Sequence, residues 1–120
     1  MLELAKGTNN RLLLQRNINV DNQINFITGY LDLNGFNTLL SPVALLTGEL
    51  ETSRITATTG GYIEITNTLN APSAANPGNL GAIITSAANL GSTTIRCGHQ
   101  SQTNGYGQGN SIRRYYDIMP

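Results

Sequence analysis

The sequence contains little charge, one cysteine, one histidine and no tryptophan. Charged residues make up 12% of the 120 residues, which is low for a globular domain. Seven basic and seven acidic residues give a formal net charge of zero. Because no basic stripe is available to neutralise a row of phosphates, nucleic-acid binding is not expected.

Long apolar runs are also missing. No stretch approaches the ~18–20 apolar residues that a membrane-spanning helix needs, so insertion into a membrane is not expected. Residues 1–10 have neither the basic start nor the apolar core of a signal peptide.

The lone Cys97 cannot form an internal disulfide. His99 stands two residues further on, so the two side chains would share one face of a strand. A zinc site would need further ligands, and no other cysteine or histidine is present to supply them. We therefore expect no catalytic residues, no metal and no cofactor, and we predict that Cys97 packs as a small buried residue.

Asn, Thr, Ser, Gln and Gly replace the missing charge, and they accompany many Ile and Leu residues. Between Arg11 and Leu40 apolar residues recur two positions apart, separated by polar ones, which is typical of short strands with one wet face. Asn-Gly and Thr-Gly pairs break the pattern where turns are expected. The apolar pairs are Leu12 and Leu14, Ile18 and Val20, Ile24 and Phe26, and Leu31 and Leu33.

We predict an all-β fold. The short alternating segments of residues 1–58 suit a short parallel β-solenoid, in which each rung of ~20–30 residues stacks on the one before. Residues 59–120 are expected to form a β-module with a long polar, Gly-rich hairpin loop, continuous with the first part. The alternative is a chain of antiparallel hairpins folded as a β-sandwich.

Local patterns in the second half predict individual strands. Residues 55–58 and 62–66 flank a Gly-Gly pair and are expected to form a hairpin. Residues 82–86 are assigned to a strand, although a short helix would also fit. Residues 92–97 alternate clearly, with Thr93, Ile95 and Cys97 predicted on one face, and residues 111–118 form a last strand that ends at an open edge.

Five polar or aromatic residues near the C-terminus are the candidates for ligand contact. Aromatic rings beside amides suit sugars, and a strand that combines arginine with tyrosine can stack cations on rings. The candidates are Asn104, Tyr106, Gln108, Arg113 and Tyr115.

The segments LGAIITSAANLGSTTIRCGH (80–99) and SIRRYYDI (111–118) resemble a β-rich module of large proteins that Bacteroidetes-type bacteria export by type IX secretion. Related phrases in that family carry arginine where this chain has Cys97. The resemblance favours the solenoid over the antiparallel alternative for residues 1–58. It also implies export, display at the cell surface or release, and a structural or adhesive role. Because the family's sorting signal is missing, we expect the chain to be an internal fragment of a larger protein.

These observations favour a non-catalytic structural or adhesive module, an adhesin-like piece of a secreted or cell-surface protein. The expected partners are other segments of the same parent protein or neighbouring subunits, and glycans. The alternatives are a carbohydrate-binding module and an accessory segment of a secreted hydrolase.

Overall fold

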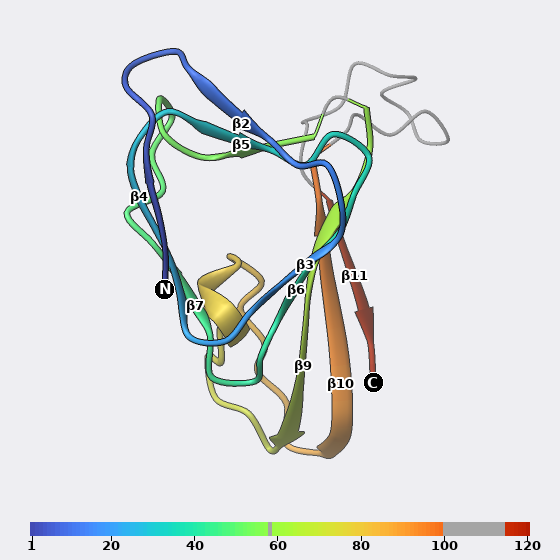
Figure 1. Ribbon diagram of the computed structural model, residues 1–120. Helices are drawn as coiled ribbons and strands as arrows, with labels where there is room; N and C mark the ends of the chain where they lie inside the picture. Colours follow the sequence, from blue (N-terminus) through green and yellow to red (C-terminus); the bar gives the residue numbers. More distant parts are fainter. Residues whose placement is uncertain (58, 100–114) are drawn as a thin grey trace, which may run out of the picture.

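The computed structural model describes residues 1–57, 59–99 and 115–120. It confirms the predicted all-β class, with parallel sheets. The strands in the first half of the chain are short, and the two longest strands follow in the second half (Figure 1). The one helical element in the described part of the chain is a single 3₁₀ segment, η1 (Pro77–Asn79).

The first half of the chain winds through three successive coils, each with three strands (Figure 1). The first coil contains β1 (Leu2–Ala5), β2 (Arg11–Leu13) and β3 (Ile18–Val20). The second contains β4 (Gln23–Thr28), β5 (Tyr30–Asp32) and β6 (Thr38–Leu40). The third contains β7 (Leu45–Thr47), β8 (Ile55–Thr56) and β9 (Tyr62–Asn70).

Strands at the same place in consecutive coils pair in parallel. The coils thus build three sheets, ordered β1-β4-β7, β2-β5-β8 and β3-β6-β9. The third sheet continues beyond the coils, because β10 (Asn89–Gly98) pairs antiparallel with β9, and β11 (Tyr115–Met119) pairs antiparallel with β10. β9 therefore joins the two predicted parts of the chain in one sheet.

The pairing overturns three local expectations. β8 pairs in parallel with β5, and β9 pairs with β6 and β10, so the predicted hairpin of residues 55–58 with 62–66 does not form. Residues 82–86 contain one isolated bridge, from Ile84 to Ala75, and no strand. The antiparallel sandwich is wrong as well, because the coil strands pair in parallel.

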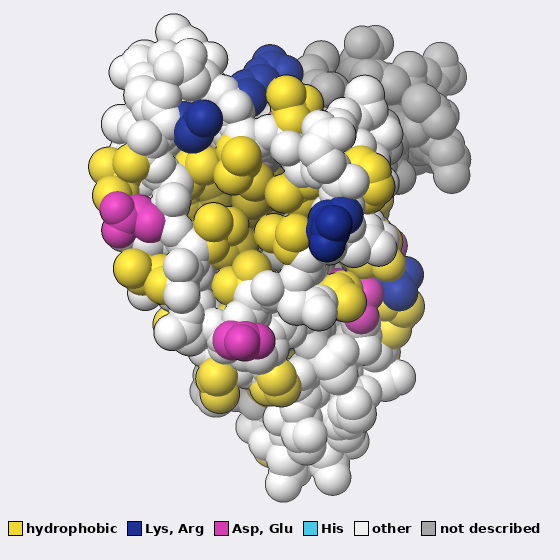
Figure 2. All heavy atoms as spheres, in the orientation of Figure 1, with side chains coloured by type: hydrophobic (Ala, Val, Ile, Leu, Met, Phe, Trp, Pro, Cys, Tyr) yellow, Lys and Arg dark blue, Asp and Glu magenta, His cyan; other side chains and the backbone are white. Residues whose placement is uncertain are grey.

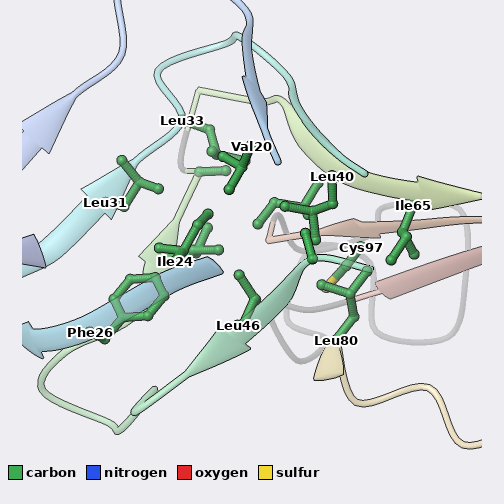
Figure 3. Packing of buried hydrophobic residues seen from close by; sticks show 14 of the residues in the cluster. Val20, Ile24, Phe26, Leu31, Leu33, Leu40, Leu46, Ile65, Leu80 and Cys97 are labelled. Carbon is green, nitrogen blue, oxygen red and sulfur yellow. The ribbon is translucent and has the colours of Figure 1, made fainter. Parts of the chain in front are cut away.

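The core fills the inside of the coils (Figure 3). The predicted inward pattern is confirmed: Leu31 and Leu33 are fully buried, and Phe26 is 4% exposed. Burial is deepest in the second and third coils. In the first coil the corresponding Leu2, Leu12 and Ile18 pack against the core but remain partly exposed.

A column of asparagines joins the coils at one corner. The Asn17 side chain accepts a hydrogen bond from the Asn37 backbone N–H (2.8 Å), and the Asn37 side chain accepts one from the Tyr62 N–H (3.1 Å). Each asparagine thus supplies an acceptor to a backbone donor of the next coil, which would otherwise lack a partner where the ladder ends.

Two corners bring backbones so close that only glycine fits. Gly48 has a φ of +77°, and a Cβ there would collide with the carbonyl oxygen of Phe26 in the second coil. Gly61 has a φ of +100°, and a Cβ there would collide with the carbonyl oxygen of Phe36. Both residues combine a left-handed conformation with a close approach of backbone.

The connection between β9 and β10, residues 71–88, closes the third-coil end of the core. Leu80 is 3% exposed, and Gly78 lies against the side chains of Leu40 and Ile65. The Asn79 side chain donates a hydrogen bond to the carbonyl oxygen of Leu46 (2.8 Å). In Figure 1 this segment, in yellow, lies across the inside of the coil near β7.

Candidate functional site

The outer face of the β9–β10–β11 sheet gathers aromatic and charged side chains. Strand register places Tyr62, Gly98 and Tyr115 in one row across the three strands. The next row on the same face contains Glu64, Arg96 and Asp117.

Arg96 is the centre of this face. Its Nε donates to Glu64 Oε2 at 2.9 Å, and its guanidinium lies 4.6 Å from the centre of the Tyr62 ring. The hydrogen bond to Glu64 raises the pKa of Arg96 above its ordinary value. Arginine carries its charge at any physiological pH, and here the charged group lies over the Tyr62 ring.

Tyr115 lies directly over Gly98. A Cβ at residue 98 would collide with the Tyr115 ring, so the ring occupies the space that a side chain would take. An aromatic ring that covers a glycine on a neighbouring strand keeps its other side turned away from the sheet. Tyr115 is partly exposed and lies in the row next to that of Arg96.

Cys97 and His99 point to the opposite, inner side of the sheet. The Cys97 sulfur and His99 Nε2 are 4.0 Å apart, and the two residues are 2% and 4% exposed. The prediction that Cys97 is buried is confirmed. Tyr116 shares this inner side, where its hydroxyl donates to the Leu80 carbonyl at 2.7 Å. A substrate in solution would not reach the thiol.

The first coil forms a second distinctive surface. In the described part of the chain, no strand pairs with the free edges of β1, β2 and β3. Figure 2 shows this face of the molecule, where apolar side chains gather in a hollow with charged groups around it. In the first coil, Arg11 forms an ion pair with Asp32 of β5 at 3.3 Å, and the Asp32 side chain is 4% exposed.

Of the five predicted contact residues, Tyr115 lies on the outer face just described. Asn104, Tyr106, Gln108 and Arg113 lie outside the described residues. Sequence analysis missed Tyr62 and Glu64 as neighbours of Tyr115, because it paired β9 with the wrong strand. The alternation that placed Thr93, Ile95 and Cys97 on one side already left Arg96 on the other.

Among residues 1–57, 59–99 and 115–120, no three His, Cys, Asp or Glu side chains come together as metal ligands would. Helices in the same part of the chain are too short and too polar to span a bilayer. Comparisons with protein-family models, curated proteins and solved structures found no significant match to this chain.

Proposed function

We propose that this chain is a non-catalytic structural or adhesive module of a secreted or cell-surface, multi-domain protein, built as a short solenoid. The observation that carries the proposal is the continuity between coils: three parallel sheets and the Asn17–Asn37 column bind each coil to the next. Solenoids of this kind are stiff and present long edges to neighbours. The resemblance to exported bacterial β-modules supports the same role.

The distribution of reactive groups also supports a non-catalytic role. The nucleophile candidate Cys97 and its neighbour His99 are buried within the sheet. Asp32 and Glu64 form ion pairs with arginines. Acid–base catalysis needs carboxylates that face each other across an accessible cleft.

The non-catalytic assignment is tested by assaying the purified chain against polysaccharides and esters, with His99→Ala as the comparison. We expect no turnover above the buffer rate for either protein. Turnover that His99→Ala abolishes would show an enzyme instead. Circular dichroism of both proteins checks that the variant is folded, so that a loss of turnover reflects chemistry.

Export is tested independently. Antibodies against the chain should label intact cells of the native organism or detect the protein in the medium. Labelling that requires permeabilised cells would contradict localisation at the surface.

Carbohydrate binding is the second candidate function, and the Tyr115 ring over Gly98 favours it. A sugar ring can stack on Tyr115, while Arg96, Glu64 and Asp117 lie within the neighbouring row and offer donors and acceptors to hydroxyl groups. Such binding does not require a deep pocket, because a flat aromatic surface with adjacent polar groups suffices.

We expect Tyr115→Ala to weaken glycan binding by roughly 5- to 150-fold, since a stacked aromatic contributes on the order of 1–3 kcal/mol to an interface. Binding is measured on a glycan array, followed by titration calorimetry with the best ligand. Tyr30→Ala, in β5 on a different sheet, is the matched control and should bind normally. Equal loss in both variants, or no glycan bound by the native chain, would contradict this candidate.

A further inference from the structure

The third coil has two sheet edges that no strand covers. Among residues 1–57, 59–99 and 115–120, no strand pairs with the outer side of β7 or of β8, whereas β9 continues into β10. An unpaired edge carries backbone N–H and C=O groups that another extended chain can join. The groups that occupy these positions therefore decide whether the edge accepts a further strand.

Hydrogen bonds to β5 identify the backbone group on the open side of β8. The Arg54 carbonyl accepts a hydrogen bond from the Leu31 N–H, so it points toward β5. The Thr56 carbonyl accepts one from the Leu33 N–H and points the same way. Because backbone groups alternate in direction along a strand, the Ile55 carbonyl points away from β5. Ile55 is thus the residue of β8 through which a further strand would pair.

The Arg54 side chain occupies that carbonyl. Its Nη1 donates to the Ile55 oxygen, and its Nε donates to the Glu51 carbonyl oxygen, both at 3.3 Å. In the described part of the chain Arg54 forms no ion pair with a carboxylate, so backbone oxygens are the partners that hold it. Hydrogen bonds from a charged donor are stronger than neutral ones, and an incoming strand would have to displace them.

Asn79 plays the same part at the edge of β7. The Leu45 N–H donates to the Asn22 carbonyl, so the backbone of Leu46 faces the open side. The Asn79 side chain, in η1, donates to the Leu46 carbonyl oxygen at 2.8 Å. Figure 1 shows η1 beside β7. Asn79 has a φ of +57°, a left-handed conformation that asparagine adopts more readily than most residues with a side chain.

We infer that Arg54 and Asn79 are edge caps, which keep strands of other chains from pairing with β8 and β7. Their side chains take the acceptors that strand addition needs, and β10 covers the remaining edge at β9. Each of the three sheets is thus closed at the third coil by a different means: an arginine, an asparagine and an antiparallel strand.

Arg54→Met tests the cap on β8, because methionine keeps an unbranched side chain and lacks the donors. Sedimentation velocity over a series of concentrations should show association beginning at a concentration at least about tenfold lower than for the native chain. Arg16→Met is the matched control. It removes the same charge from an exposed residue between β2 and β3, and it should sediment as the native chain does.

Asn79→Gly tests the cap on β7, since glycine keeps the left-handed backbone and loses only the side chain. We expect a smaller shift than for Arg54→Met, because this hydrogen bond joins neutral groups, and the largest shift in the double variant. Asn9→Gly, at an exposed residue with a φ of +65°, is the control and should leave association unchanged. Circular dichroism and urea denaturation check that every variant starts from the folded chain.

Infrared spectroscopy of the associated double variant separates strand pairing from other contacts. We expect its amide I band to gain the component typical of intermolecular β-sheet. Association without that component would reject edge capping. A double variant that associates no more than the native chain would reject it too, as would equal association of Arg54→Met and Arg16→Met, which would trace the effect to the lost charge alone.

Discussion

Gly61→Ala is expected to destabilise the fold by about 2–5 kcal/mol. A left-handed φ costs a residue with a side chain roughly 1–2 kcal/mol, and overpacking against a rigid neighbour adds about 1–3 kcal/mol. Here the neighbour is the backbone carbonyl of Phe36, which cannot move without disturbing the second coil. Urea denaturation measures the effect as a lower midpoint at unchanged m-value.

Gly91→Ala is the matched control. Gly91 also has a positive φ, of +69°, but a Cβ there meets nothing within 4 Å. It should therefore lose only the conformational term, about 1–2 kcal/mol. Equal losses in the two variants would show that the approach of the Phe36 carbonyl contributes nothing, and that the coils can separate at this corner at no cost.

Leu31→Ala is expected to cost about 2–5 kcal/mol, the range for a large apolar side chain removed from a packed core. Leu31 is fully buried in the middle coil and pairs on one side with Leu12 and on the other with Ile55. The neighbouring strands on both sides cannot move in to fill the cavity that Leu31→Ala leaves, because hydrogen bonds between the coils hold each backbone in place.

Leu39→Ala provides the comparison for the core variant. Leu39 lies in β6 but is 41% exposed on the outside of the sheet. Its loss should remain within about 0.5 kcal/mol, as for most surface substitutions. A similar shift of the urea midpoint in the two variants would mean that the interior of the coils does not dominate stability.

The alternation of apolar residues identified which side chains face inward, because the period of a strand is visible in the sequence itself. Leu31 and Leu33 are both fully buried, as that period requires. The same reasoning placed Ile95 and Arg96 on opposite faces of one strand, and in the structure Ile95 is buried whereas Arg96 is partly exposed.

Strand partners were harder to predict than strand faces. Two strands with a Gly-Gly pair between them, 55–58 and 62–66, have the local signature of a hairpin. Their hydrogen bonds go instead to β5 and β6, strands of the previous coil. Parallel pairing links residues about twenty or more positions apart, and no short-range rule contains that information.

Sequence alone indicated one residue of the candidate site, but not the residues that lie next to it. Tyr115 could be chosen from its neighbours in sequence, since a tyrosine beside arginines on a strand suits stacking. Its place over Gly98 depends on the register of β11 against β10. Tyr62, more than fifty residues earlier, joins the same face only because β9 pairs with β10.

The covering of one end by residues 71–88 limits how far this chain can polymerise. A stack of coils that is open at both ends can add copies head to tail without limit and grow into a fibre. With Leu80 filling the third-coil end and Asn79 bound to the Leu46 carbonyl, that end offers no apolar hollow for the next copy to enter. Head-to-tail addition at that end would have to displace residues 71–88, so the fold itself opposes growth into long filaments there.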